Sequence, residues 1–253
     1  MCTLTLLRQS QSQWPILIAA NRDEKADRAW LPPGRHWLEF PDIIAGIDQY
    51  GGGSWIGANT SGVTAAILNR QGSLGPQENK RSRGEIVIEA LTHNDAATGA
   101  EALIDLNSAA YRDFNLLLTD NTHTYWIKLD SAHNPNIHIS EIPDGLWMLA
   151  SGDLNDFSNP RIKFFFPKFA SATTPRPDEK DWTEWKRLLQ ASSPTTRPED
   201  GMCFQNNEGY GTLSSSLIAL PNKEFTQNLT QPAFEWLFCN GPPNSKEYSE
   251  ITI

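Results

Sequence analysis

Hydrophobic and polar residues alternate at the start of the chain in the pattern of a β-strand. In residues 2–8, Leu4 and Leu6 alternate with Thr3 and Thr5, and a period of two places the two sets on opposite faces of a sheet. The next run, residues 15–21, is apolar on both faces, which is typical of a strand buried on both sides. Strand patterns return near the other end of the chain, in residues 211–220 and 233–238.

Apolar residues recur at helical spacing in two places in the interior of the chain. The first place begins at Ser82, which has the spacing of a capping box with Glu85. The second begins at Asn159, which is a good N-cap before Pro160 in the first turn. A further helix follows at each place, so the helices come in two pairs. The predicted helices cover residues 83–92, 94–106, 160–169 and 181–190.

Short runs of strand-forming residues occupy much of the remaining chain, and a proline-rich stretch at residues 30–37 predicts a loop. Strands therefore open and close the chain, with the helices between them. This order favours layered sheets with helices packed outside over a regular βαβ alternation. No linker separates two parts, so we expect one domain over residues 1–253. The additional predicted strands are residues 43–49, 54–59, 63–69, 115–119, 125–129, 136–142 and 146–150.

Composition and charge narrow the classes of function. Lys and Arg total 21 against 30 Asp and Glu, a net charge of −9, and residues 80–83 are the one basic cluster, so a nucleic-acid partner is not expected. Apolar runs such as residues 15–20 fall short of the roughly 20 residues of a membrane span. The first residues lack the pattern of a secretory signal. The three cysteines form neither a disulfide framework nor a zinc site. We expect a cytoplasmic protein that is not transmembrane and binds no metal.

Cys2 is the first candidate for chemistry. An initiator methionine is usually removed when the second residue is small, and removal would leave a free α-amine on the residue that carries the thiol. Reference pKa values are about 7.7–8.0 for the amine and about 8.5 for the thiol, so one residue would hold both a base and a nucleophile. If Met1 is retained, that base does not exist. The alternative interpretation is that Cys2 is only a small apolar residue at the start of an edge strand.

A second candidate is the polar run Asn21-Arg22-Asp23-Glu24, which directly follows a buried strand. If the strand continues, Asn21 and Asp23 share one face while Arg22 and Glu24 share the other. An arginine can also pair with a carboxylate through two hydrogen bonds, which fixes its position. The run is either a solvated turn or part of a site.

Together, the segments Met1-Cys2-Thr3-Leu4 and Asn21-Arg22-Asp23-Glu24 resemble the NRDE family, also called the transport and Golgi organisation family. The resemblance implies the fold of the N-terminal-nucleophile (Ntn) hydrolases, an α+β four-layer αββα sandwich with two stacked antiparallel sheets between helix layers. The likeness continues in family order through residues 52–57, Asn69-Arg70, residues 82–84, residues 152–155 and Tyr210-Gly211-Thr212.

Within that fold, the chain resembles penicillin and bile-salt amidases with an N-terminal cysteine, and the resemblance implies catalytic roles. Cys2 would attack a carbonyl carbon, and its α-amine would shuttle the proton. Asp23 would orient the amine, and Asn69 would donate a hydrogen bond to the oxyanion. The positive charge of Arg22 would lower the pKa of the thiol.

Two departures from those amidases leave the roles open. Their arginine and aspartate are three residues apart, whereas Arg22 and Asp23 are adjacent, so the division of roles among Arg22, Asp23 and Glu24 is not fixed. Leu213 also stands where relatives often carry an arginine. The two functions that remain open are a cysteine amidohydrolase or thioesterase, and a non-catalytic carrier of haem or acyl-CoA, as in haem trafficking or lipid handling.

A small-molecule ligand is expected in either case. The glycine run 51–53 lacks the Gly-Lys-Ser/Thr ending of a phosphate-binding loop, so it would let the backbone approach Cys2 or a ligand closely. Trp55, which lies close to this glycine run in sequence, would line the pocket or belong to the core. The basic segment 80–83 would bind the anionic end of haem or acyl-CoA, or would be a solvated loop. The expected ligand-binding residues are Asn21, Glu24, Gly53, Trp55, Arg81 and Arg83.

Overall fold

The structure is a computed structural model that describes residues 2–222 and 233–252. The described chain divides into two compact units, each built from separate stretches of sequence. The first unit contains residues 2–27, 144–222 and 235–252, and the second contains residues 28–143 and 233–234. Each unit has an antiparallel sheet and two α-helices, so the fold is α+β, as predicted.

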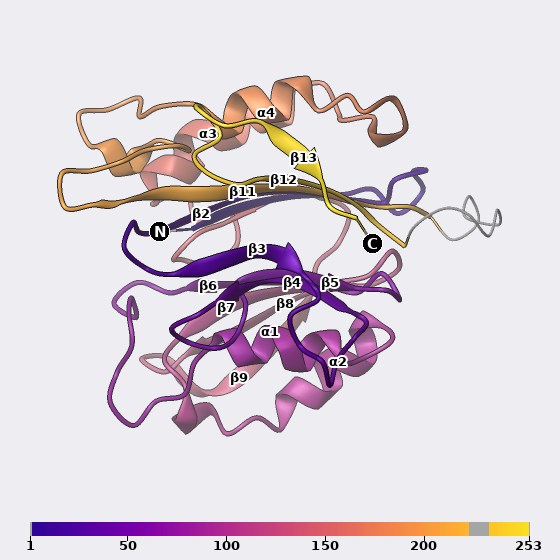
Figure 1. Ribbon diagram of the computed structural model, residues 1–253, viewed down its shortest axis with the longest axis vertical. Helices are drawn as coiled ribbons and strands as arrows, with labels where there is room; N and C mark the ends of the chain where they lie inside the picture. The colour runs from indigo at the N-terminus through magenta and orange to yellow at the C-terminus, as the bar shows by residue number, and fades with distance from the viewer. Residues whose placement is uncertain (1, 223–232, 253) are drawn as a thin grey trace. The chain divides into compact units, whose positions relative to one another are not determined.

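The sheet of the first unit has six strands in the order β10-β1-β2-β11-β12-β13, all antiparallel to their neighbours. The helices α3 and α4 cover one face of this sheet (Figure 1). The elements are β1 (Thr3–Arg8), β2 (Ile16–Lys25), β10 (Gly145–Leu149), β11 (Tyr210–Leu220), β12 (Glu235–Cys239), β13 (Tyr248–Glu250), α3 (Pro160–Ser171) and α4 (Thr183–Leu189).

The core of the first unit lies between this sheet and its two helices. Alternation along β2 places Leu17 and Ala19 in that core, where they pack in one buried cluster with Phe165 of α3 and Trp185 of α4. Helix α3 begins as the sequence predicts, because the Asn159 side chain accepts hydrogen bonds from the backbone amides of the first turn. Residues 17, 19, 21 and 23 therefore lie on the helix-covered face of β2.

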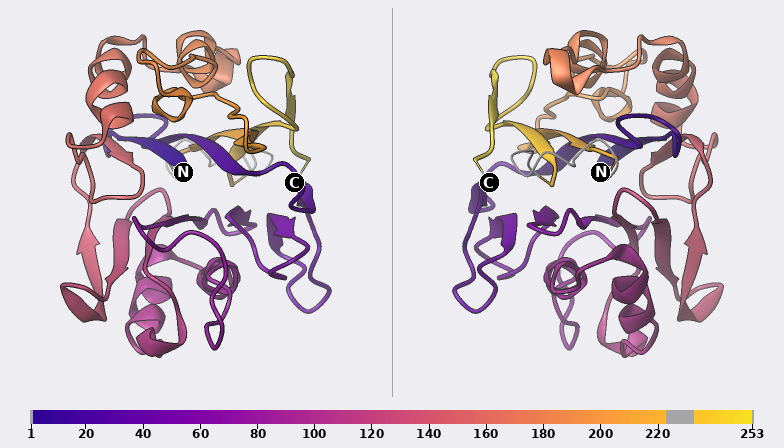
Figure 2. Two further views of the ribbon diagram at one scale, coloured as in Figure 1. Left: turned by 90° about the vertical axis from the view of Figure 1, so that its left-hand side faces the viewer. Right: turned by 90° about the vertical axis from the view of Figure 1, so that its right-hand side faces the viewer.

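The sheet of the second unit is an antiparallel meander of seven strands in sequence order from β3 to β9. The helices α1 and α2 follow β6 and lie on one face of this sheet, as Figure 2 shows from two sides. The elements are β3 (Trp30–Gly34), β4 (Ile43–Asp48), β5 (Ile56–Asn59), β6 (Thr64–Asn69), β7 (Phe114–Thr119), β8 (Thr124–Asp130), β9 (Asn134–Glu141), α1 (Gly84–Leu91) and α2 (Ala96–Ile104).

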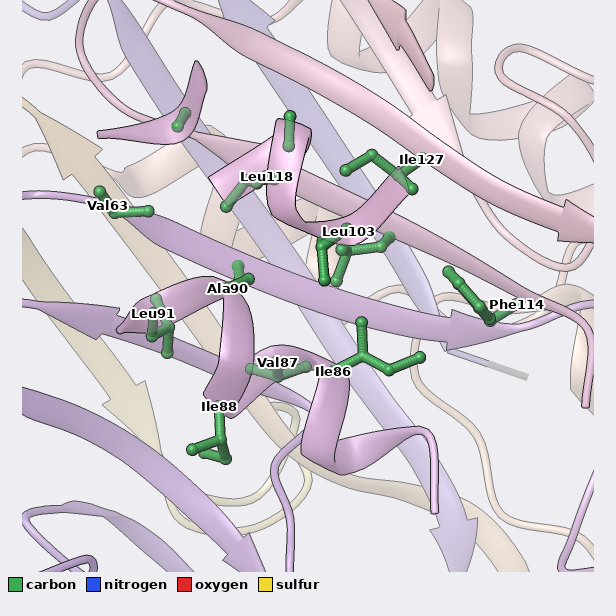
Figure 3. Packing of buried hydrophobic residues seen from close by; sticks show 14 of the residues in the cluster. Val63, Ile86, Val87, Ile88, Ala90, Leu91, Leu103, Phe114, Leu118 and Ile127 are labelled. Carbon is green, nitrogen blue, oxygen red and sulfur yellow. The ribbon is translucent and has the colours of Figure 1, made fainter. Parts of the chain in front are cut away.

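A second buried cluster fills the space between these helices and their sheet. Ile86 and Leu103 come from the helices, and Phe114, Leu118 and Ile127 come from the central strands; all five are fully buried. Figure 3 shows their side chains meeting between the two layers. Each unit thus has its own hydrophobic core. Three short 3₁₀ helices complete the described secondary structure, at Ser108–Ala110, Pro177–Glu179 and Pro198–Asp200.

Two predictions about local structure were wrong. The proline-rich stretch predicted as a loop forms β3, which pairs with β4 alone and shifts register between Leu31 and Gly34. Proline is tolerated there because an edge strand leaves one row of backbone groups unpaired. Ser82 does not cap α1: its hydroxyl accepts a hydrogen bond from the Gly84 amide at 3.3 Å, and the N-cap residue, Arg83, makes no side-chain capping bond.

Candidate functional site

Cys2 lies immediately before β1, beside the polar end of β2. The antiparallel register pairs Thr3 with Asn21, which brings the residue before Thr3 next to Arg22 and Asp23. The Cys2 sulfur is 3.7 Å from the main-chain carbonyl oxygen of Asp23, and Cys2 is half-buried. The run from Asn21 to Glu24 is therefore part of strand β2 and no solvated turn.

The surroundings of Cys2 raise the pKa of its thiol. Burial is the largest cause, and the negative charge of Asp23 raises the pKa further. The charge of Arg22 lowers it, as the sequence predicts, but Arg22 is a smaller influence than burial. At neutral pH the Cys2 thiol of the intact chain is therefore protonated, and it needs a base before it can act as a nucleophile.

The carboxylate of Asp23 is fully buried and lies in a network of hydrogen bonds. Arg161 of α3 donates to one carboxylate oxygen at 2.8 Å, and the Thr212 hydroxyl of β11 donates to the other at 2.8 Å. The same guanidinium donates to the hydroxyl of Thr3 at 2.5 Å and to the carbonyl of Glu199 at 2.7 Å. An ion pair this deeply buried fixes the positions of its partners, because separating them leaves an uncompensated charge.

Tyr210 of β11 contacts the other end of the same aspartate. Its hydroxyl donates a hydrogen bond to the Asp23 carbonyl oxygen at 2.8 Å, the same oxygen that the Cys2 sulfur contacts. Burial raises the pKa of Tyr210 strongly, and the neighbouring charges of Cys2 and Asp23 add to the effect. The phenol is therefore a neutral hydrogen-bond donor at physiological pH.

The remaining polar residues of β2 have separate environments. The amide nitrogen of Asn21 donates to the carbonyls of Leu189 and Met202 at 2.9 and 2.8 Å, which anchors the end of α4 to the sheet. Arg22 is buried, and strand alternation places it on the face opposite Asn21. Glu24 accepts a hydrogen bond from the Lys25 amide. The ligand-binding roles expected of Asn21 and Glu24 stay predictions.

Three other predicted site residues belong to the second unit. Asn69 is the last residue of β6, and its amide nitrogen lies 3.4 Å from the Arg70 carbonyl oxygen. Gly53 approaches the backbone of Gly84 so closely that a Cβ atom at residue 53 would lie 2.2 Å from the Gly84 carbonyl carbon. Trp55 packs against Gly46 and makes an edge contact with Trp30 at 5.5 Å between ring centroids. Their roles in catalysis or ligand binding stay predictions.

The basic segment at residues 80–83 makes contacts within the second unit. Arg81 forms an ion pair with Glu85 and lies over the Tyr111 ring. Arg83 donates to the Ser73 hydroxyl and to the carbonyl of Asp113, both at 2.9 Å. Through these contacts the segment holds neighbouring loops of the second unit in place. Its expected role as an anion-binding rim stays a prediction.

The sequence did not identify Arg161 as part of the site, and it gave Tyr210 and Thr212 no role of their own. Tyr210 and Thr212 were visible only as landmarks of the family resemblance. Arg161 lies 138 residues from Asp23 along the chain, and neither periodicity nor spacing links residues so far apart. An arginine at a predicted helix start, with no acidic residue in the same helix, was the one signal present.

A cavity of about 340 Å³ lies in the first unit near this network. Thr212, Cys203 and Asn244 line it together with Leu213. Cys203 and Cys239 are both buried, and the Cys239 sulfur contacts two carbonyl oxygens. Among residues 2–222 and 233–252, no three side chains of His, Cys, Asp or Glu are grouped so that they could hold a metal ion. None of the helices in these residues has both the length and the apolar character of a membrane span.

Comparison with known families finds a match over most of the chain. Residues 1–231 match the model of the family described as Transport and Golgi organisation 2. Homologues of the Transport and Golgi organization protein 2 from Bos taurus and Homo sapiens are each 31% identical over 119 residues. These matches cover 44% of this chain and 41% of each relative, so the matched region spans less than half the length of the relatives.

Solved structures with the same fold are hydrolases of low sequence similarity. A variant of the conjugated bile acid hydrolase from Clostridium perfringens has a TM-score of 0.55 at 10% identity, covering 100% of this chain and 97% of that one. The Caenorhabditis elegans N-acylethanolamine-hydrolyzing acid amidase ortholog has a TM-score of 0.53 at 12% identity, covering 85% and 92%. These similarities confirm the predicted Ntn-hydrolase fold.

Proposed function

We propose that this chain, which belongs to the Transport and Golgi organisation 2 family, cleaves an amide or thioester bond with Cys2 as an N-terminal nucleophile. The observation that carries the proposal is the place of Cys2 at the start of β1, with its sulfur against the Asp23 carbonyl and next to Arg22. The names of the two structural neighbours, an acid amidase and a bile acid hydrolase, support a hydrolase.

The chemistry requires a base for the thiol. Because burial raises the pKa of Cys2, the sulfur is protonated at neutral pH and nucleophilic attack needs a proton acceptor nearby. Removal of Met1 would supply one, since the α-amine of Cys2 would then be free, with a reference pKa of about 7.7–8.0. The proposal therefore requires that the mature protein begins at Cys2.

The reaction then proceeds through a covalent intermediate. The thiol proton passes to the α-amine as the sulfur forms a bond to the substrate carbonyl carbon. The ammonium returns that proton to the departing amine or thiol as the carbon–nitrogen or carbon–sulfur bond breaks, which leaves an acyl group on Cys2. Water then hydrolyses this thioester and releases the carboxylic acid. Asn69 is the proposed donor to the oxyanion.

Intact mass and turnover test the proposal together. The measurement compares a form that begins at Cys2 with one that retains Met1, using a fluorogenic fatty-acyl amide and the matching acyl thioester. We expect turnover and a transient acyl adduct only in the form that begins at Cys2, and neither in its Cys2→Ala variant. Cys203→Ser is the matched control and should retain turnover. Equal turnover in Cys2→Ala and wild type would overturn the proposal.

A second candidate is a carrier of haem or acyl-CoA that does not turn its cargo over. The raised pKa of Cys2 favours this candidate, because a neutral thiol is a poor nucleophile but an acceptable wall for an apolar ligand. Both cargoes combine an apolar body with an anionic end, which buried apolar side chains and a cation would bind.

Equilibrium binding to haem and to a long-chain acyl-CoA tests the carrier. We expect dissociation constants in the micromolar range, about −8 kcal/mol, that weaken as salt rises. Charge reversal at Arg81 and Arg83 should weaken binding further if the basic segment takes the anionic end. A protein that binds neither ligand but hydrolyses acyl amides is an enzyme and not a carrier.

A further inference from the structure

Arg161 and Tyr210 both donate hydrogen bonds to Asp23, the residue whose carbonyl oxygen the Cys2 sulfur contacts. We propose that Arg161 and Tyr210 are positioning residues for Cys2. Arg161 donates hydrogen bonds to the Asp23 carboxylate and to the Thr3 hydroxyl, and Tyr210 donates one to the Asp23 carbonyl that the thiol contacts. The inference rests on the proposed function in taking Cys2 as the reacting group. Neither residue is required to touch a substrate.

Arg161 connects the two strands that carry the site. One guanidinium nitrogen bonds both the Asp23 carboxylate of β2 and the Thr3 hydroxyl of β1, at 2.8 and 2.5 Å. Thr3 directly follows Cys2, so the backbone of the reacting residue is tied to the buried ion pair. The guanidinium is itself buried, and its second terminal nitrogen is held by the Glu199 carbonyl. The planar donor group of arginine suits this task, whereas the ammonium of lysine is a point donor.

Tyr210 acts on the carbonyl end of Asp23. Its hydroxyl lies 2.8 Å from that oxygen, and the Cys2 sulfur lies 3.7 Å from it. The two donors therefore share one acceptor. A carbonyl that already accepts a strong hydrogen bond from a phenol is a weaker acceptor for a thiol. Because an S–H···O contact stabilises the neutral thiol, the phenol makes the proton of Cys2 easier to remove.

Replacing Tyr210 with Phe gives a specific prediction. The ring and its packing remain, but the Asp23 carbonyl becomes more available to the thiol, and the neutral form of Cys2 gains stability. Alkylation of Cys2 at neutral pH should become slower by about threefold, and its pH–rate profile should move to higher pH. A purely structural loosening would have the opposite effect, because greater exposure speeds alkylation.

The experiment measures the alkylation rates of individual cysteines by iodoacetamide and peptide mass spectrometry from pH 6 to 9.5. Tyr248→Phe is the matched control, since Tyr248 is a half-buried tyrosine of the same unit whose hydroxyl bonds Ser215 at 2.7 Å. Cys239, which is fully buried, is the reference thiol for Tyr210→Phe.

Arg161→Lys is the second variant. It keeps the charge but cannot hold Thr3 and Asp23 with the same geometry, so Cys2 should be alkylated faster by about threefold while Cys239 is unchanged.

Both variants give outcomes that decide the inference. It is supported if Tyr210→Phe slows Cys2 and Arg161→Lys speeds it, with Tyr248→Phe leaving the Cys2 profile as in wild type. The positioning role of either residue is overturned if its variant leaves the Cys2 profile as in wild type, or if Cys2 and Cys239 accelerate together in that variant. The role of Tyr210 is also overturned if Tyr210→Phe makes Cys2 alkylation faster. Turnover is not a readout here. A shifted Cys2 profile in a protein without hydrolase activity would therefore sustain the positioning roles while the proposed function fails.

Discussion

Asp23 affects Cys2 in two ways. Its carbonyl oxygen contacts the thiol, whereas its negative charge raises the pKa of that thiol and so works against reaction. The carboxylate itself is occupied by Arg161 and Thr212 on the helix-covered face of β2. The geometry thus gives Asp23 a structural task beside the amine-orienting role that the family resemblance implies.

Asp23→Asn separates these effects. The amide keeps the size of the side chain but removes its charge, so the pKa of Cys2 should fall and alkylation at pH 7 should become faster. The free energy of unfolding should drop by about 3 kcal/mol, because Arg161 is left buried without its charged partner. The measurements are the alkylation profile of Cys2 and urea unfolding. Glu24→Gln, the neighbouring carboxylate, should change neither; slower alkylation of Cys2 in Asp23→Asn would contradict the prediction.

Cys239 should make stability dependent on pH in the alkaline range. Burial is the main cause that raises its pKa from 9.0 to about 11. The folded state therefore holds the thiol proton more tightly than the unfolded state. The resulting stabilisation is complete below the unfolded pKa and is lost as pH rises through about 11, with a total of about 3 kcal/mol.

Replacing Cys239 with Ser removes the titrating group from this residue. We expect the free energy of unfolding of Cys239→Ser to fall less steeply between pH 9 and 11 than that of wild type, measured by urea unfolding at each pH. An unchanged slope would mean that the thiol titrates alike in both states.

Two helices in the chain have different N-terminal chemistry, although both had a capping signal in the sequence. Asn159 accepts two backbone hydrogen bonds at the start of α3, whereas Ser82, which is not the N-cap residue of α1, accepts only one, from the Gly84 amide at 3.3 Å. Helix α3 also carries Arg161 in its first turn. The cap of α3 therefore stabilises both a helix and the residue that binds Asp23.

Asn159→Ala and Ser82→Ala form a matched pair. The first should lower the free energy of unfolding by about 1 kcal/mol, since two amides of the first turn lose their acceptor. The second should change it by less than about 0.5 kcal/mol. Urea unfolding measures both, and an equal loss in the two variants would show that Ser82 is a cap after all.

Distant parts of the chain meet in the sheet of the first unit. Strand β1 comes from the start of the chain, and β12 and β13 come from its end, with β2 and β11 between them. The register pairs Ser215 of β11 with Cys239 of β12. β11 is therefore an inner strand only because the last strands cover its edge.

Ending the chain after residue 234 removes β12 and β13 and exposes the edge of β11. We expect this truncated protein to aggregate, because β11 would present a long edge of residues that are mostly buried in the intact protein. Size-exclusion chromatography and circular dichroism measure the outcome. Ending the chain after Ile251, beyond β13, is the control and should leave a monodisperse protein; a soluble and cooperatively folding form without β12 and β13 would contradict the expectation.

The sequence determined the strands and helices whose pattern is local. Alternation identified β1, a run apolar on both faces identified β2, helical spacing identified the four α-helices of the described residues, and Asn159 marked the start of α3. Local pattern failed where pairing decides the outcome: the prolines of β3 fit only because it is an edge strand, and the short strand β13 forms by pairing with β12. Cys2 and the run from Asn21 to Glu24 were recognisable because each is contiguous in sequence.

Tertiary structure alone decided the partners of those residues and the protonation of the thiol. Arg161, Thr212 and Tyr210 reach Asp23 through packing that joins residues more than 130 positions apart, and no local pattern encodes such a contact. Arg22 alone would lower the pKa of Cys2, yet burial outweighs it. Desolvation depends on everything that surrounds a group in space, so it becomes defined only when the chain has folded.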